Sequence, residues 1–542
     1  MSALLEIDQL RVSLGQARVL DGVSFEVDAG EVVGLVGESG SGKSMTALSV
    51  MGLLPAHAQV SGAIRLDGKD LTAKTEAQRC RLRGRDIGLV FQEPMTALNP
   101  LMTIGEQVAE TVRVHRAVSH QKAVALAHTA LARVGLGASQ VAPTRYPHEL
   151  SGGQRQRVAI AIAIVLAPKL IIADEPTTAL DVTTQAQILD LLVALAREEG
   201  AALVLITHDL AVVGQYSDRI VVLKDGAVVE QGYTDIVLAA PQAPYTQRLL
   251  ADSTYVAKHA ARDFSKAPVA LDVSAVVREY RRPRQRLFGA RETVRAVDGV
   301  SLVLRAGERV GLVGESGCGK STLLRTILAL DAPQAGSITL HGAPLSQARG
   351  AALRLQRRRL QVVFQDPFGS FDPRWRVERV VAEPFHLLDQ APDARTRRRK
   401  VDEVLECVGL RAADADRYPH EFSGGQRQRI AIARALITEP EIIAFDEAVS
   451  ALDVTVRAQI LDLLGDIAQQ RSLAYLFVSH DLAIVRAITD RVYVMQAGRI
   501  VEQGPTEQVF AAPTHAYTAQ LLAALPRLVR ATAPDEVERL PA

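Results

Sequence analysis

The chain has little cysteine, no excess of charge and no long apolar run. Its three cysteines, Cys80, Cys318 and Cys407, are widely spaced in 542 residues, so neither a disulfide framework nor a cysteine-rich metal site is indicated. The 62 basic and 61 acidic residues nearly cancel, which gives no overall support to nucleic-acid binding. No apolar run reaches the roughly 18 residues that cross a bilayer, and the longest candidate, 158–167, predicts a buried helix.

Residues 1–8 lack the basic segment of a secretory signal, so we expect no signal peptide. Apolar residues are plentiful, because 48% of the 542 residues are hydrophobic, and this favours more than one domain with large cores. We expect a cytoplasmic chain that is either soluble or held at a membrane by other subunits.

Residues 37–44, GESGSGKS, match the phosphate-binding pattern G-x-x-x-x-G-K-[ST]. The apolar run 32–36 before them predicts a buried strand, and 45–51 after them predict a helix. The loop N–H groups and the helix N-terminus would bind phosphates, with Lys43 at the β- and γ-phosphates and the Ser44 hydroxyl on Mg²⁺. The nucleotide-binding candidates are Gly37, Glu38, Ser39, Gly40, Ser41, Gly42, Lys43 and Ser44.

The same loop occurs again at 314–321, as GESGCGKS after the apolar run 310–313. Other short stretches also recur, at offsets of 272 to 277 residues, and a register held over that distance indicates two copies of one domain. The second set of nucleotide-binding candidates is Gly314, Glu315, Ser316, Gly317, Cys318, Gly319, Lys320, Ser321 and Thr322.

Strand-like and helix-like segments alternate within each copy, which predicts an α/β core with a mostly parallel sheet. The helix-rich stretches 105–134 and 377–408 predict an inserted α-helical subdomain, and segments such as 22–27 and 299–304 predict additional β structure. We expect domains at 1–255 and 269–525, a linker at 256–268 and a weakly ordered tail at 526–542. The basic stretches 281–286, 357–359 and 397–400 are expected to be solvated loops.

An apolar strand ending in two carboxylates occurs in each copy, at 170–175 and 442–447. An acidic residue at the carboxyl end of such a strand lies beside the phosphate loop. Asp174 and Asp446 would hold Mg²⁺, and Glu175 and Glu447 would accept a proton from the attacking water. Either pair alone could instead be a helix cap.

The most specific elements are LSGGQ at 150–154 and FSGGQ at 422–426, each after Tyr-Pro-His-Glu and before an expected helix. Their candidate phosphate ligands are Ser151, Gly152, Gly153 and Gln154, and Ser423, Gly424, Gly425 and Gln426. Together with the phosphate loops, these motifs resemble the nucleotide-binding domains of ATP-binding cassette (ABC) proteins. The resemblance covers nearly the whole chain, twice.

The resemblance implies two tandem P-loop ATPase domains, each with an antiparallel β subdomain, that close head to tail on two ATP molecules. Loop 37–44 would share one ATP with 423–426, and loop 314–321 would share the other with 151–154. Further matches to the family pattern are the Q-loop glutamines, which touch Mg²⁺ and the attacking water, the γ-phosphate-sensing histidines and the D-loop aspartates: Gln92, Gln365, His208, His480, Asp181 and Asp453. Both sites are complete, so we expect both to hydrolyse ATP.

The residue that usually stacks on adenine is Leu14 in the first copy, while Tyr280 is the candidate in the second. Base–aromatic stacking contributes ~1–3 kcal/mol in nucleic-acid complexes, so we expect somewhat weaker adenine binding at the first site.

Residues 243–250, APYTQRLL, and 515–522, HAYTAQLL, follow the two domains at matching places. They resemble the peptide, nickel and glutathione importer ATPases, in particular the fused peptide/microcin C importer ATPases of the Yej type. Some of these relatives carry a C-terminal cysteine cluster that this chain lacks, so we expect no iron–sulfur cluster.

The resemblance implies two transmembrane permease subunits and a periplasmic or lipid-anchored solute-binding protein, and no nucleic acid. The chain would lie on the cytoplasmic side of the inner membrane, as a peripheral subunit. A soluble twin-cassette translation factor is an alternative, but those proteins carry a long charged helical linker that 251–268 does not supply. A DNA-repair or chromosome-organising ATPase is a weaker alternative, because no long heptad region or zinc-type cysteines interrupt the copies.

Overall fold

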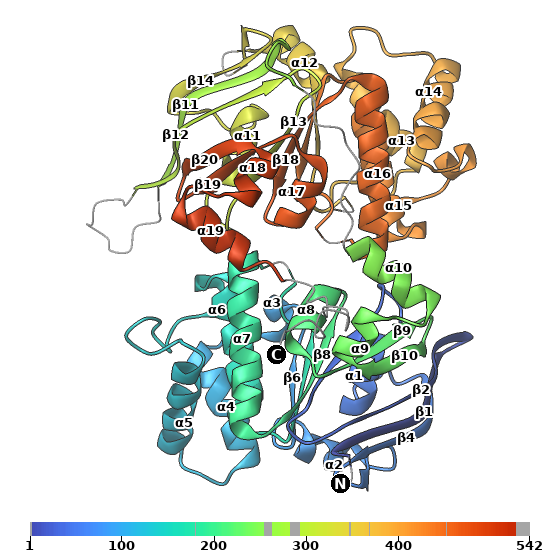
Figure 1. Ribbon diagram of the computed structural model, residues 1–542, viewed down its shortest axis with the longest axis vertical. Coiled ribbons are helices and arrows are strands. Elements are labelled where there is room, and N and C mark those ends of the chain that lie inside the picture. The colour runs from blue at the N-terminus through green and yellow to red at the C-terminus, as the bar shows by residue number, and fades with distance from the viewer. Residues whose placement is uncertain are drawn as a thin grey trace, which may run out of the picture.

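The computed structural model describes residues 3–178, 180–253, 263–281, 293–345, 348–367, 369–450 and 452–526. Expectations about Ala179, Ala451, most of the linker, residues 282–286 and the tail from 527 concern residues outside this set. We call the two copies the first repeat and the second repeat (Figure 1).

The central sheet of the first repeat has the strand order β10-β9-β3-β8-β7-β6. All neighbouring strands are parallel except β9 and β10, which form an edge hairpin. A second, antiparallel sheet has the order β2-β1-β4-β5. The strands are β1 (Leu5–Leu14), β2 (Ala17–Val27), β3 (Val32–Val36), β4 (Ala58–Leu66), β5 (Lys69–Asp70), β6 (Ile87–Val90), β7 (Leu170–Asp174), β8 (Ala202–Thr207), β9 (Arg219–Lys224) and β10 (Ala227–Tyr233).

The helices of the first repeat include an inserted group between β6 and β7, as expected from the helix-forming stretch there. They are α1 (Lys43–Met51), α2 (Glu76–Leu82), α3 (Pro94–Ala97), α4 (Ile104–His115), α5 (His120–Arg133), η1 (Pro147–Glu149), α6 (Gly152–Ile164), α7 (Val182–Glu199), α8 (Leu210–Tyr216), α9 (Thr234–Ala239) and α10 (Pro244–Ser253).

The second repeat has the same design, with a central sheet of order β16-β17-β18-β13-β19-β20 and an antiparallel sheet of order β12-β11-β14-β15. Its strands are β11 (Val269–Arg281), β12 (Thr293–Arg305), β13 (Arg309–Val313), β14 (Ala335–Leu340), β15 (Ala343–Pro344), β16 (Leu360–Val363), β17 (Ile442–Asp446), β18 (Ala474–Ser479), β19 (Arg491–Gln496) and β20 (Arg499–Pro505). Its helices are α11 (Lys320–Ile327), α12 (Gly350–Arg359), α13 (Val377–Ala382), η2 (Glu383–Leu387), α14 (Ala394–Cys407), η3 (Ala412–Asp416), η4 (Pro419–Glu421), α15 (Gly424–Leu436), α16 (Val454–Arg471), α17 (Leu482–Ile488), α18 (Thr506–Ala511) and α19 (Ala516–Ala523).

The expected α/β fold with two mostly parallel sheets is confirmed. All residues of β3 and β8 are buried, as parallel strands covered on both faces must be, and this explains why they are continuous apolar runs. The turn at 224–226 joins β9 to β10 with positive φ angles at Asp225 (48°) and Gly226 (80°), which is the type I′ geometry that a two-residue hairpin prefers.

Two basic stretches lie on helices instead of the loops that we expected. Residues 357–359 end α12, and 397–400 lie within α14. Arginine and lysine are good helix formers, and Arg398 is also paired with Asp402, one turn along the helix, at 2.9 Å. The basic side chains of these two stretches therefore stabilise and solvate α12 and α14.

The core of the second repeat contains an aromatic cluster at positions where the first repeat has aliphatic residues. Phe445 stacks on Phe477 at 4.4 Å between ring centroids and meets Tyr475 edge-on at 5.2 Å. The first repeat has the smaller residues Ala173, Leu203 and Leu205 at the corresponding positions. The two repeats therefore have the same fold but different side chains in this part of the core.

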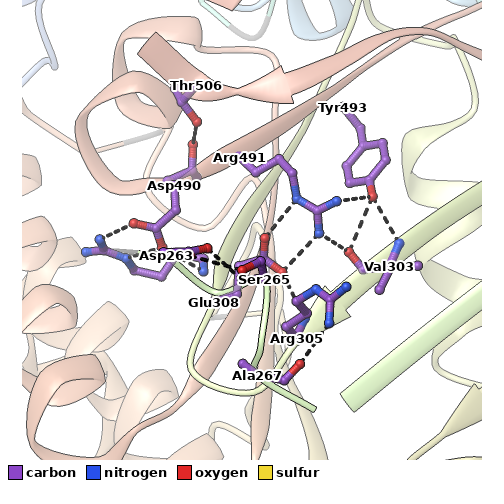
Figure 2. Close-up of polar contacts among 12 residues, drawn as sticks. Asp263, Ser265, Ala267, Val303, Arg305, Glu308, Asp490, Arg491, Tyr493 and Thr506 are labelled. Carbon is purple, nitrogen blue, oxygen red and sulfur yellow. Dashed lines mark hydrogen bonds and ion pairs between the residues drawn. The ribbon is translucent and has the colours of Figure 1, made fainter. Parts of the chain in front are cut away.

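A polar cluster ties the start of β13 to β19 in the second repeat (Figure 2). Arg491 donates to both oxygens of Glu308, at 2.8 and 3.0 Å, and to the Tyr493 hydroxyl at 2.9 Å. The side chain of Glu308 is 5% exposed. In the first repeat the corresponding Arg219 donates to Glu31 and to the Glu26 carbonyl, both at 3.4 Å.

The two repeats are stacked along the long axis of the molecule, with α10 and α19 at the seam between them (Figure 1). Helix α10 of the first repeat packs against α16 of the second, and α19 of the second packs against α7 of the first. In the described part of the chain, no helix combines the length and apolarity needed to span a membrane.

Candidate functional site

Each phosphate loop lies between a central strand and the helix that follows it. In the first repeat the Lys43 ammonium donates to the carbonyl oxygens of Gly37 and Glu38, both at 2.8 Å. Lys320 does the same with Gly314 and Glu315, at 2.7 and 2.9 Å. Burial lowers the pKa of Lys43, although neighbouring carboxylates led by Glu175 oppose the shift. Each ammonium is thus directed at the carbonyl groups of its own loop.

Glycine at the first loop position is required by close packing. A Cβ atom on Gly37 would collide with the carbonyl oxygen of Leu223, and one on Gly314 would collide with that of Met495. The loop therefore lies directly against the end of the neighbouring strand, and any larger residue would displace the backbone that faces the phosphates.

The residues expected to hold Mg²⁺ lie together in both repeats. The Ser44 hydroxyl donates to Asp174 at 3.1 Å, and the Ser321 hydroxyl donates to Asp446 at 3.4 Å. Burial raises the pKa of both aspartates, and the adjacent glutamate adds to the effect. A hydroxyl and one carboxylate are hard oxygen donors, and Mg²⁺ commonly takes one or two carboxylates together with waters and substrate phosphates. The donor set fits Mg²⁺ as a partner of a bound nucleotide.

The glutamates that follow these aspartates are held in an unusual backbone conformation. Glu175 and Glu447 have φ angles of 44° and 49°, in the left-handed region that few non-glycine residues occupy. Their N–H groups donate to the Ile206 and Val478 carbonyls on the neighbouring strand, at 3.0 and 2.8 Å. Each glutamate is therefore fixed by the sheet, turned away from the line of the strand.

The Glu175 carboxylate contacts two residues predicted to act with it, Gln92 and His208, and also Thr178, which was not predicted. Gln92 donates to it at 2.8 Å and Thr178 at 3.1 Å, and His208 Nδ1 lies 3.3 Å away. Burial would raise the pKa of Glu175, but the hydrogen bond and charge of His208 and the charge of Lys43 outweigh it and lower the pKa. Glu175 therefore remains an ionised carboxylate that can accept a hydrogen bond from water.

The second site is similar but less crowded. His480 Nδ1 lies 3.0 Å from Glu447, and although burial opposes it, that contact raises the pKa of the imidazole and lowers that of the carboxylate. Ser450 occupies the place of Thr178 but donates to the Glu447 backbone. Within the described residues no hydrogen bond joins Gln365 to Glu447. The sequence motifs are the same, but the two carboxylates have different partners.

The Ser-Gly-Gly-Gln motifs form the N-termini of α6 and α15. Ser151 and Ser423 are the N-caps, and each closes a capping box with the glutamine three residues later. A Cβ atom on Gly153 would lie 2.5 Å from the Thr184 methyl group, so this first turn packs closely on the start of α7. Each motif thus presents a helix N-terminus, which favours a negatively charged ligand.

Backbone amides of each phosphate loop are held by the D-loop of the other repeat. The Ser39 N–H donates to Asp453 at 2.7 Å. On the other side the Ser316 N–H donates to Asp181, and the Thr183 hydroxyl lies 2.8 Å from a Glu315 carboxylate oxygen. Residues predicted to meet at the seam are therefore brought together there, from positions more than a hundred residues apart.

The sequence-based prediction of the site missed two tyrosines. The Tyr245 hydroxyl accepts a hydrogen bond from the Glu38 N–H at 3.0 Å, and the Tyr517 hydroxyl accepts one from the Glu315 N–H at 2.9 Å. Both tyrosines belong to the repeated motifs after the two domains, so their recurrence was the available signal.

Tyr280, the candidate for stacking on adenine, is 39% exposed on β11. Its hydroxyl donates to Asp331 at 3.2 Å, and the Arg278 guanidinium lies 4.8 Å from its ring centroid. Stacking on adenine remains a prediction for this residue.

Two parallel-sheet domains, each with a phosphate loop, a carboxylate pair and a Ser-Gly-Gly-Gln helix start, define an ATP-binding cassette ATPase. The ABC transporter family matches residues 20–178 and 297–450, and the C-terminal region of the oligopeptide/dipeptide transporter family matches 501–541. The chain belongs to the oligopeptide/dipeptide group of ABC transporter ATPases, and it hydrolyses ATP to drive transport.

Three relatives illustrate this group. The chain is 46% identical to the peptidoglycan transport ATP-binding protein YejF of Agrobacterium fabrum, over 96% of each chain. It is 43% identical to the oligopeptide transport ATP-binding protein OppD of Mycobacterium bovis, over 97% of this chain and 99% of that one. It is 44% identical to the glutathione import ATP-binding protein GsiA of Salmonella paratyphi A, over 93% of this chain and 86% of that one.

Proposed function

We propose that the chain is the energy-coupling subunit of an importer for peptides, working through two permease subunits and a solute-binding protein. The observation that carries this proposal is the match of residues 501–541 to the C-terminal region of the oligopeptide/dipeptide transporter family, on a chain with two ABC transporter matches. The subunit would lie at the cytoplasmic face of the inner membrane, where its permeases present their cytoplasmic surfaces.

For the chemistry, we propose two composite ATP sites. Phosphate loop 37–44 would share one ATP with Ser423–Gln426 of the other repeat, and loop 314–321 would share the other with Ser151–Gln154. The seam contacts of Asp453 with Ser39 and of Asp181 with Ser316 support this pairing, because they already join each loop to the opposite repeat.

Within each site, we propose a role for each of these residues, from its position and from the family resemblance. Glu175 and Glu447 would act as general bases toward the attacking water, held in place from the sheet and kept ionised by their neighbours. His208 and His480, beside those carboxylates, would contact the γ-phosphate. Mg²⁺, held by the serine and aspartate of each repeat, would neutralise phosphate charge. Gln92 and Gln365 would link the site to the permeases.

Glutathione is the strongest alternative solute, because GsiA of Salmonella paratyphi A is named as a glutathione import protein. Nickel is a further alternative from the family resemblance. The permeases and the binding protein would select the solute, so the ATPase sequence discriminates weakly among these.

The test is uptake of labelled solutes by cells that lack the gene and are complemented with the wild-type chain or with Glu175→Gln/Glu447→Gln. We expect tripeptide uptake to be restored by the wild-type chain alone. Restoration of glutathione or Ni²⁺ uptake, with no effect on peptides, would overturn the peptide assignment. The inactive variant controls for effects of the protein's presence.

A further inference from the structure

The repeated motifs at 243–250 and 515–522 place one phenol on each phosphate loop. Tyr245 and Tyr517 are the second residues of α10 and α19, and their hydroxyls accept from the Glu38 and Glu315 N–H groups at 3.0 and 2.9 Å. The two contacts are made independently by two copies that differ elsewhere in core packing. The recurrence indicates that this hydrogen bond is a regular part of each nucleotide site.

The tyrosine and the loop lysine hold the same peptide group. In the first repeat the Gly37 carbonyl accepts from Lys43, while the Glu38 N–H of that peptide donates to Tyr245. The second repeat repeats this with Lys320 and Tyr517. When an ammonium turns toward phosphate, the carbonyl loses its partner, and the phenol is then the contact that holds the orientation of the peptide.

The next amide along each loop is held from the opposite repeat. Ser39 N–H donates to Asp453, and Ser316 N–H donates to Asp181. Two consecutive amides therefore bind two different elements, namely the C-terminal helix of their own repeat and the D-loop of the other. Helix α10 also packs on α16, and α19 on α7, the helices that follow those D-loops.

Each C-terminal helix is fixed at its own start, so its phenol has a defined position. Glu230 on β10 accepts from the Gln242 and Ala243 N–H groups at 2.7 and 3.2 Å. Glu502 on β20 accepts from Thr514 and His515 N–H groups at 2.7 and 3.1 Å. The loop peptide is thereby connected through one helix to the edge of the central sheet.

Burial raises the pKa of Tyr245 to about 12, and the carboxylates of Glu38 and Asp453 contribute to that shift while the Glu38 N–H opposes it. Burial also raises the pKa of Tyr517. Both phenols stay protonated at neutral pH, so each remains a neutral acceptor for the loop amide.

We propose that Tyr245 and Tyr517 are positioning residues for ATP, which hold the first peptide of each phosphate loop where it meets the D-loop of the opposite repeat. This gives the repeated C-terminal motif a function inside the ATPase itself. The inference depends on ATP binding by the two loops and is independent of which solute is transported.

The test isolates one site at a time in the full-length chain. Tyr245→Phe is placed in a Lys320→Ala background and Tyr517→Phe in a Lys43→Ala background, and binding of adenylyl-imidodiphosphate with Mg²⁺ is measured by calorimetry. Losing one neutral hydrogen bond predicts a rise in Kd of about fivefold, within a range of roughly threefold to tenfold. In the chain with both lysines intact, KM for ATP should rise while kcat changes by less than about twofold, because the lost contact is one of binding.

Two matched variants remove a phenol hydrogen bond elsewhere. The Tyr216 hydroxyl donates to Asp190 at 2.9 Å, and the Tyr475 hydroxyl donates to the Leu464 carbonyl at 3.0 Å. Tyr216→Phe and Tyr475→Phe should leave the nucleotide Kd unchanged. Nucleotide should also raise the melting temperature of these controls by as much as it raises that of the wild-type chain. The increase for the Tyr245→Phe chain should be smaller.

An unchanged Kd in both test variants would overturn the proposal. Equal rises in Kd for the test variants and the controls would also overturn it, because they would show a general loss of stability. A fall in kcat with no change in Kd or KM would contradict the assigned role, since it would place the phenols in the chemical step.

Discussion

Two threonines at matching positions give a sharp test of the seam between the repeats. Thr183 and Thr455 each lie two residues after the D-loop aspartate, and both are 6% exposed. The Thr183 hydroxyl lies 2.8 Å from Glu315 across the seam and 2.7 Å from Asp181. Within the described residues, the Thr455 hydroxyl has no hydrogen-bond partner. Valine has nearly the same shape as threonine, so the substitution removes the hydroxyl alone.

The two substitutions should differ in their effect on the free energy of unfolding. A hydrogen bond to a charged acceptor contributes about 1.5–3 kcal/mol, and Thr183→Val leaves two carboxylates facing each other without a shared proton. Since one hydroxyl proton serves both acceptors, we take about 1.5 kcal/mol, which lowers the melting temperature by about 3–6 °C for a domain of this size. Thr455→Val removes a buried hydroxyl without a partner, so we expect no loss, or a gain of up to about 1 kcal/mol.

The assay is calorimetric melting of the two single variants and of the wild-type chain without nucleotide. Equal losses in the two variants would refute the reasoning, as would a larger loss in Thr455→Val. ATP hydrolysis by Thr183→Val should also fall more than that of Thr455→Val, because only the first variant breaks a contact between the repeats.

Two further predictions concern the second repeat. Arg491→Ala leaves the buried Glu308 without its paired charge and should cost about 3 kcal/mol. Arg219→Ala breaks two longer contacts, to Glu31 and to the Glu26 carbonyl, both at 3.4 Å, and should cost no more than about 1 kcal/mol; similar losses on calorimetric melting would contradict this. The raised pKa of His480 beside Glu447 means that the pair's contribution to stability is fully present below about pH 6.5 and is lost as the pH rises through the raised value. The melting-temperature penalty of His480→Gln should therefore be larger at about pH 6 than at about pH 9, and an equal penalty at both would be evidence against the ion pair.

Much of the fold could be predicted because its signals are local. The apolar run 32–36 is the strand β3 with the same bounds, since a strand buried on both faces needs a continuous apolar run. The phosphate loops and the paired carboxylates could also be predicted, because a few consecutive residues set their geometry and give each a short pattern.

The features that could not be predicted from the sequence depend on contacts between distant segments of the chain. Tyr245 and Glu38 are 207 residues apart, and Thr183 and Glu315 are 132 apart, and no local pattern reports which side chain will reach which amide. Strand β1 was also not predicted, because Gln9 has a positive φ of 48° and register shifts interrupt its pairing with β2. The differing partners of Glu175 and Glu447 likewise follow from packing and not from the shared motifs.

The central claim is that this ATPase drives two permeases. The most direct test is affinity purification of the tagged chain from detergent-solubilised membranes, with the co-purifying proteins identified by mass spectrometry. We predict two hydrophobic multi-span proteins in equal amounts, whose presence stimulates ATP hydrolysis when the solute-binding protein is added with peptide. Recovery of ribosomal proteins, with the chain absent from the membrane fraction, would contradict the account.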